Sequence, residues 1–138
     1  RDRQAPMIGV DFGTATTFDA ISAKGEYLGG IIAPGMQISA DALFQRAARL
    51  PRVDMRKPCE VIGKTTVGAI ESGLYYGYIG LVDGVVRRMR GELGQDAVCI
   101  ATGGLAGVIA PEVDVIEHVD PDLTLQGLRM VWERNRPR

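Results

Sequence analysis

The chain has 138 residues, of which 46% are hydrophobic and 24% charged, a composition typical of one globular domain. Its 16 basic and 17 acidic residues give a net charge of −1, so neither nucleic acid nor a membrane surface is expected as a partner. Neither Cys59 nor Cys99 belongs to a CxxC pair or lies near the single histidine, His118. This argues against a zinc site and for reduced thiols in a cytoplasmic protein.

The first part of the chain reads as three extended segments. Residues 7–10 form an apolar run, and residues 16–22 alternate and are rich in β-branched and aromatic side chains. Residues 28–33 form a third extended run after a glycine-containing turn. These segments predict a meander of three antiparallel strands.

Two helices are expected next. Helical spacing follows Pro34-Gly35 and predicts a helix that ends before Pro51. Residues 65–92 predict one long helix. Its expected apolar stripe consists of Val67, Ile70, Leu74, Leu81 and Val85. Four glycines share another face of this helix, which predicts that a second backbone packs closely there. They are Gly73, Gly77, Gly80 and Gly84.

The last part of the chain alternates strands and helices. Residues 97–102 predict a strand, residues 105–110 a short helix, and residues 113–119 another strand. An amphipathic helix is expected from Asp120, which stands at the N-cap position. The order of elements predicts a mixed α/β fold, in which the sheet has an antiparallel edge and a parallel remainder.

The stretch Asp11-Phe12-Gly13-Thr14-Ala15-Thr16 has little side-chain bulk. A turn of glycine and small residues lets backbone N–H groups approach an anion, and the hydroxyls of Thr14 and Thr16 add donors. Asp11 at the strand end is an oxygen ligand for a cation beside that anion. The same residues suit an ordinary tight hairpin, so the pattern alone leaves both interpretations open.

A second glycine turn, Thr102-Gly103-Gly104, follows the fourth predicted strand and opens a helix. Such a turn offers free N–H groups and room for a flat ligand, although it is also a common connection between a strand and a helix. Two glycine turns, each after a strand, favour a nucleotide site more than either turn does alone.

The sequence Gly63-Lys64-Thr65-Thr66 looks like the end of a P-loop. However, Pro58 stands where that pattern requires a glycine, and no strand precedes it. We therefore expect Thr65 or Thr66 to begin the long helix, where a hydroxyl caps free N–H groups or contacts a ligand.

Five motifs in this order resemble the type III pantothenate kinases: DFGTATTFD, GGIIAPG, IGKTTVGAIESG, ATGGLA and HVDPDLTLQGL. The resemblance covers essentially the whole chain. It implies a ribonuclease H-like, actin-like ATPase domain with helices packed on the sheet. It also implies a cytoplasmic, homodimeric enzyme that phosphorylates pantothenate with ATP in the first step of coenzyme A biosynthesis. The implied cofactors are Mg²⁺ and a monovalent cation, K⁺ or NH₄⁺.

Several positions match functional residues of that family. Asp11 matches the ligand of the monovalent cation, and Thr66 matches the pantothenate contact at the start of the long helix. Thr65 departs mildly from the family, which usually has asparagine there. Residues 29–35 match a stretch that shapes the pocket. The ATP-binding residues implied by the resemblance are Gly13, Thr14, Thr16, Thr102, Gly103 and Gly104.

Two parts of the family pattern have no counterpart in the chain: the first phosphate loop and the Gly-x-Asp-Arg stretch that supplies the general base. We therefore expect residues 1–138 to be the C-terminal domain of a two-domain kinase. The N-terminal domain would be absent from this chain, which would hold no catalytic residue and be inactive or nearly so alone. Two alternatives stay open: a non-catalytic regulatory or accessory relative, and an actin-like kinase for a sugar or acetate.

Overall fold

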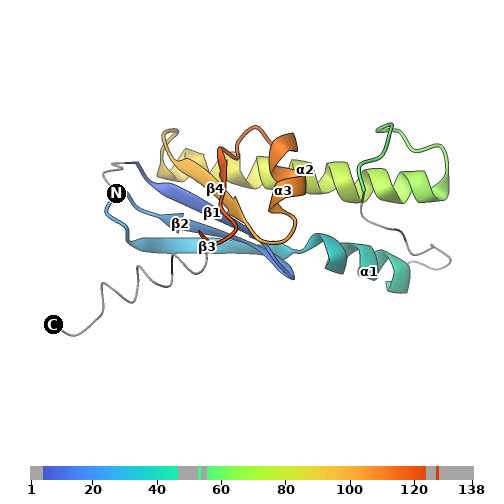
Figure 1. The fold of residues 1–138 in the computed structure, drawn as a ribbon, viewed down its shortest axis with the longest axis horizontal. Helices are drawn as coiled ribbons and strands as arrows, with labels where there is room; N and C mark the ends of the chain where they lie inside the picture. Colours follow the sequence, from blue (N-terminus) through green and yellow to red (C-terminus); the bar gives the residue numbers. More distant parts are fainter. Residues whose placement is uncertain (1–4, 47–52, 54–55, 124–126, 128–138) are drawn as a thin grey trace.

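The computed structural model describes residues 5–46, 53, 56–123 and 127 (Figure 1). The strands are β1 (Met7–Phe12), β2 (Ala15–Ile21), β3 (Tyr27–Pro34), β4 (Val98–Thr102) and β5 (His118–Val119). The helices are α1 (Met36–Arg46), α2 (Thr66–Leu93), α3 (Ala106–Ile109) and the 3-10 turn η1 (Ala110–Glu112). The predicted order of elements is confirmed as far as β5.

The five strands form one mixed sheet in the order β3-β2-β1-β4-β5. The strands β1, β2 and β3 pair antiparallel, whereas β4 pairs parallel with β1 and β5 pairs parallel with β4. The predicted meander and the parallel remainder are both confirmed. The chain is therefore an α/β domain built on a five-stranded mixed sheet.

The core lies between the sheet and α2, which crosses one face of the sheet (Figure 1). Side chains alternate along β1, so that Ile8, Val10 and Phe12 are buried on this face while Asp11 faces the other way and is half-buried. From α2, Val82 and Val86 are fully buried in the same core. The alternation thus places Asp11 on the face opposite α2.

The buried stripe of α2 differs from the predicted one. Its buried apolar residues are Leu74, Tyr75, Tyr78, Val82, Val86 and Met89. Val67 is 40% exposed and was wrongly predicted to belong to the stripe. The physical reason is that the first turns of α2 extend beyond the sheet, at the right of Figure 1, where no strand covers them. Farther along the helix, bulky tyrosines occupy the core-facing positions.

The glycine face of α2 is open within the described part of the chain. A Cβ atom added to Gly73, Gly77 or Gly80 would meet no atom within 4 Å, and one added to Gly84 would meet only Arg88 Nη1 at 3.3 Å. The predicted close approach of another backbone is therefore not made by the described residues of this chain. A shallow cavity of about 140 Å³ lies beside Gly73 and Gly77, where Met36 of α1 faces α2.

The Gly80→Ala substitution tests whether a second chain packs on the glycine face. In an isolated chain, alanine has space there, and we expect the free energy of unfolding to rise by up to about 1 kcal/mol through helix propensity. Gly91→Ala is the matched control, because Gly91 is equally open near the end of the same helix. Urea unfolding of both variants measures the effect. A loss of stability at Gly80 alone, growing with protein concentration, would show that a partner packs there.

The end of the chain matches the prediction only in part. Residues 113–117 were predicted as strand, but β5 comprises only His118–Val119. Val113, Val115 and Ile116 are buried in the core without pairing as a strand, so their apolar pattern was misleading. The Asp120 carboxylate accepts a hydrogen bond from the Asp122 N–H at 2.9 Å, as expected at an N-cap. Most of the helix predicted after Asp120 lies outside the described residues.

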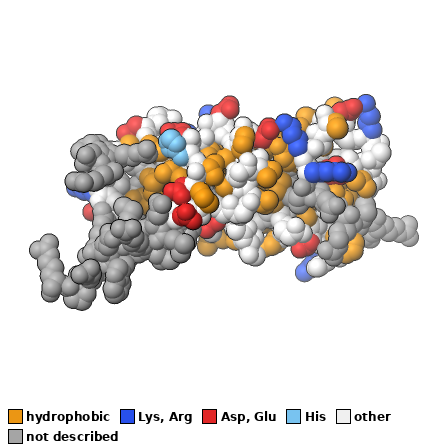
Figure 2. All heavy atoms as spheres, viewed as in Figure 1, with side chains coloured by type: hydrophobic (Ala, Val, Ile, Leu, Met, Phe, Trp, Pro, Cys, Tyr) orange, Lys and Arg blue, Asp and Glu red, His pale blue; other side chains and the backbone are white. Residues whose placement is uncertain are grey.

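Large apolar side chains reach the surface at several places. Ile32, Ile62 and Val108 are more than half exposed. Figure 2 shows hydrophobic side chains over the middle of one face of the molecule. Among the residues that the structure describes, no helix is both long enough and apolar enough to cross a membrane.

Candidate functional site

The two glycine turns meet where β1 and β4 end. Because these strands are parallel neighbours, Asp11 lies in register with Thr102, and both turns leave the sheet at the same edge. Ligands of open α/β sheets bind outside the carboxyl ends of the strands, where the strand order changes direction. The sheet thus brings the carboxylate of Asp11 and the turn after Thr102 to the edge where a ligand is expected.

Gly103 is the closest link between the two turns. Its φ is +98°, a conformation that side chains with a Cβ rarely adopt. A Cβ atom there would lie 2.7 Å from the carbonyl oxygen of Phe12 and 2.8 Å from Oδ1 of Asp11. Only glycine lets the second turn come this close, and the Asp11 carboxylate is consequently held against the backbone of Gly103.

A third glycine supports the first turn from the other side of the meander. A Cβ atom on the buried Gly35, which follows β3, would lie 2.9 Å from the carbonyl carbon of Thr14 and 3.2 Å from the carbonyl oxygen of Gly13. The sequence analysis assigned residues 29–35 only to the shape of the pocket and missed this contact. The Pro34-Gly35 pair was its signal, because a glycine directly after a strand permits such close packing.

The residues of the two turns are small, and several of them reach the surface. Gly13, Thr14 and Gly104 are exposed, whereas Thr102 is buried. Among the described residues, the Asp11 carboxylate has no hydrogen-bond or ion-pair partner. A half-buried carboxylate without a partner, beside turns without side-chain bulk, is suited to a cation bound next to an anion.

Thr16 does not join this group. It is fully buried on the α2 face of the sheet, where its hydroxyl forms a hydrogen bond with the hydroxyl of Tyr78. The ring of Phe12 lies 6.0 Å from that of Tyr78. Burial raises the pKa of Tyr78 to about 12, so its hydroxyl stays protonated. The structure thus places Thr16 under the turn rather than on its surface.

Removal of the Tyr78 hydroxyl should destabilise the chain. Tyr78→Phe leaves the fully buried hydroxyl of Thr16 without its partner, which costs about 1–3 kcal/mol. The free energy of unfolding in urea measures this loss. The double variant Tyr78→Phe/Thr16→Val should recover most of it, because both polar groups are then gone. Equal stability of the single variant and the parent would contradict the hydrogen bond.

Two buried groups predict how stability depends on alkaline pH. Burial raises the pKa of the Cys99 thiol from 9.0 to about 11 and that of Tyr78 from 10.0 to about 12. Since the folded state holds both protons more tightly, the stabilisation is complete below about pH 9 and is lost as the pH rises towards 12. Urea titrations across this range should show the fall, and Cys99→Ala should delay its onset to about pH 10. A flat profile would contradict both assignments.

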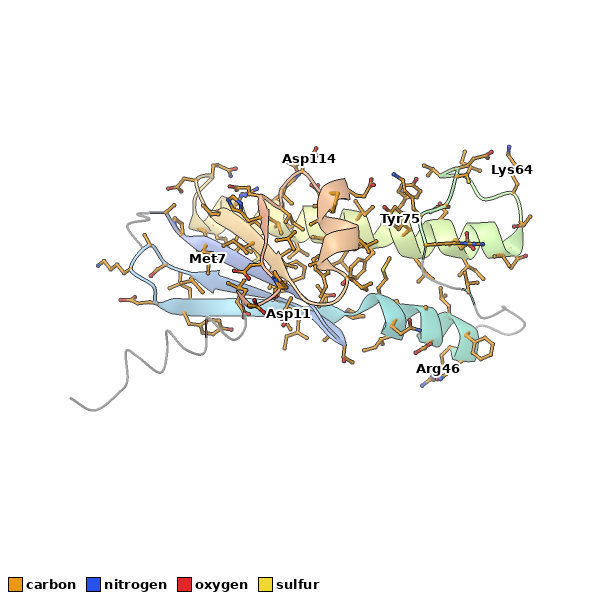
Figure 3. The ribbon with its side chains drawn as sticks, in the orientation of Figure 1. Met7, Asp11, Arg46, Lys64, Tyr75 and Asp114 are labelled. Atoms are coloured by element: carbon orange, nitrogen blue, oxygen red, sulfur yellow. The ribbon has the colours of Figure 1, made fainter. Side chains whose placement is uncertain are left out.

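Thr66 lies away from the glycine turns of its own chain. The Thr65 side chain caps α2 by accepting a hydrogen bond from the Gly68 N–H at 3.0 Å, which confirms the predicted helix start. Thr66 is the exposed first residue of α2. Figure 3 shows the nearby Lys64 at the end of α2 that projects beyond the sheet, whereas Asp11 lies at the sheet.

A solved structure shares the fold of this α/β domain. The chain is similar to the crystal structure of a Baf family protein from Campylobacter jejuni, with a TM-score of 0.64 and 23% sequence identity. The match covers 94% of this chain and 58% of that one. At this identity the similarity shows the fold alone.

Sequence comparison identifies the family. The family model of the type III pantothenate kinases matches residues 1–88, and the chain belongs to this family. It is 62% identical over 130 residues to a type III pantothenate kinase from Moorella thermoacetica and 59% identical over 131 residues to one from Koribacter versatilis. These matches cover 94% and 95% of this chain but 51% and 48% of the relatives. The chain therefore spans about half the length of the curated relatives that it matches.

Proposed function

We propose that this chain is the C-terminal domain of an ATP-dependent pantothenate kinase and forms one wall of its ATP site. The observation that carries the proposal is the meeting of the two glycine turns around the Asp11 carboxylate, at the carboxyl ends of β1 and β4. Membership of a kinase family supports ATP as the phosphate donor. The N-terminal domain of the complete protein would supply the other wall.

In this proposal, the two turns divide the nucleotide between them. The exposed Gly13-Thr14 turn binds the phosphates through backbone N–H groups and the Thr14 hydroxyl. The Thr102-Gly103-Gly104 turn lies against the adenosine, where the absence of side chains leaves room for a flat base. The hydroxyl of Thr16 acts indirectly, since its bond to Tyr78 fixes the strand that leaves the first turn.

Asp11 would hold the monovalent cation, K⁺ or NH₄⁺. The residues suit this assignment, because a carboxylate oxygen stands beside a backbone that has no Cβ at Gly103. The described residues contain no group of three or more His, Cys, Asp or Glu side chains that could enclose a metal ion. The cation would offset charge on the transferring phosphoryl group. Mg²⁺ is expected with ATP, and we assign it no residue of this chain.

The reaction would be an in-line transfer of the terminal phosphoryl group to the hydroxyl of pantothenate. Positioning and neutralisation of charge supply most of the rate in such transfers. A carboxylate outside this chain would accept the hydroxyl proton. Thr66 would contact pantothenate, and because it lies away from the turns of its own chain, the proposal includes a homodimer in which other parts of the assembly complete the pantothenate site.

A chimera tests the proposal. The part of the Moorella thermoacetica relative that precedes the matched segment is joined to this chain, and phosphorylation of pantothenate by ATP is measured in potassium and in sodium. We expect activity in potassium, little in sodium, and none from this chain alone.

Two results would contradict the proposal. Activity of the chain alone would place the general base within these 138 residues. A folded, dimeric chimera without activity would favour the non-catalytic relative of the same fold.

A further inference from the structure

Two polar residues in the first two turns of α2 are buried. Glu71 is 8% exposed and Ser72 is 7% exposed, and both precede the buried Leu74 and Tyr75. Polar side chains that leave water need hydrogen-bond partners, and a charged one needs them most. The pattern of an amphipathic helix therefore does not explain these two residues.

Both side chains bind the segment Arg56–Lys64, which we call the 56–64 loop. Oε1 of Glu71 lies 3.2 Å from Nε of Arg56, and the hydroxyl of Ser72 donates a hydrogen bond to the carbonyl oxygen of Val61. The loop lies beside the first turns of α2, at the right of Figure 1. The buried side chains of Glu71 and Ser72 thus bind the loop and not the sheet.

Gly63 brings the end of this loop into direct contact with the backbone of α2. A Cβ atom on Gly63 would lie 2.5 Å from the Cα atom of Ala69 and 2.5 Å from the carbonyl carbon of Gly68. Two residues later, the carbonyl oxygen of Thr65 accepts the first helical hydrogen bond, from Ala69 N–H at 2.8 Å. The path of the loop therefore sets where the helix begins.

We propose that Glu71 and Ser72 are positioning residues that act through the 56–64 loop to fix Thr66 for pantothenate. Thr66 is exposed on a helix end that no strand supports, and helix ends fray unless neighbouring contacts hold them. The bonds from Glu71 and Ser72 and the Gly63 contact hold this end, in addition to the cap that Thr65 forms. The inference rests on the proposed function, because it assigns Thr66 to substrate.

The test uses Ser72→Ala, which removes one hydroxyl, and Glu71→Gln, which removes one charge at constant size. The control is Asp83→Asn, because Asp83 also pairs with an arginine on α2, with its Oδ2 2.8 Å from Nε of Arg87, but at a site away from the loop. Amide hydrogen exchange of residues 61–69 is measured in the complete chain. The KM values for pantothenate and ATP are measured in the chimera.

We expect exchange over residues 61–69 to become roughly tenfold faster in both variants, the factor given by losing about one hydrogen bond. The KM for pantothenate should rise by a similar factor, with the KM for ATP unchanged and the control like the parent. Unchanged exchange would show that the bonds from Glu71 and Ser72 to the 56–64 loop do not hold the start of α2. Faster exchange with an unchanged KM for pantothenate would overturn the positioning role. A folded, dimeric parent chimera without activity would instead refute the proposed function, and the positioning role with it, whatever the exchange showed.

Discussion

Replacing Asp11 with alanine is expected to abolish the potassium dependence of pantothenate phosphorylation and most of the activity of the complete enzyme. The Asp11 carboxylate lies against the backbone of Gly103 and has no partner among the described residues. It would therefore supply the negative charge that binds a cation there. Without the cation, the charge that develops during transfer is no longer offset. We expect kcat to fall by about 10²–10³-fold, as when one electrostatic contact to a transition state is removed.

The measurement is the rate of the chimera at saturating ATP and pantothenate over a series of potassium concentrations, at constant ionic strength. Asp19→Asn is the matched control. Asp19 is a half-buried carboxylate on the same face of the sheet, but it already interacts with Tyr27, whose pKa is raised by desolvation and by the charge of Asp19. The control should keep its response to potassium. If potassium still activated the Asp11→Ala enzyme as it activates the parent, Asp11 would not be the ligand of the cation.

Much of the sheet could be predicted because its signals are local. Alternation along β2, followed by a turn at Gly25 and the extended run of β3, predicts a hairpin without reference to the rest of the chain. The pairing of β1 with β4 has no local signal, because these strands are about 90 positions apart. Their order in the sheet also depends on which helix covers the sheet. The sequence therefore suggested two separate glycine turns, and only the register of Asp11 with Thr102 joins them.

The burial of Thr16 was open to prediction but was not predicted. Its neighbour across the hairpin is Phe12, and paired residues face the same side of a sheet. Because Phe12 belongs to the buried alternation of β1, Thr16 had to be buried with it. The partner of its hydroxyl, Tyr78, lies 62 positions away on α2 and had no local signal.

The polar residues within α2 could not be interpreted from periodicity. Glu71 and Ser72 look like the exposed side of an amphipathic helix, yet both are buried because the 56–64 loop covers them. A loop without regular structure leaves no repeating pattern in the sequence. Its one local sign was Gly63, whose close approach to α2 a sequence does not reveal.

Gly103→Ala should lower both the stability of the chain and its use of ATP. Alanine at a φ of +98° is strained by about 1–3 kcal/mol, and its Cβ would meet Phe12 and Asp11 at the closest point between the two turns. Gly104→Ala is the matched control, because a Cβ atom there meets nothing within 4 Å. We expect the control to change the free energy of unfolding by no more than about 0.5 kcal/mol.

Urea unfolding of the chain measures the first effect, and the KM for ATP and the potassium response of the chimera measure the second. Because the new Cβ displaces the carboxylate of Asp11 as well as the turn, Gly103→Ala should weaken activation by potassium, which Gly104→Ala should leave intact. If the two alanine variants were equally stable and equally activated, the contact between the turns would not be what holds Asp11 in place. If only Gly103→Ala lost stability and activation by potassium, one backbone contact would support both the cation and the adenosine side of the site.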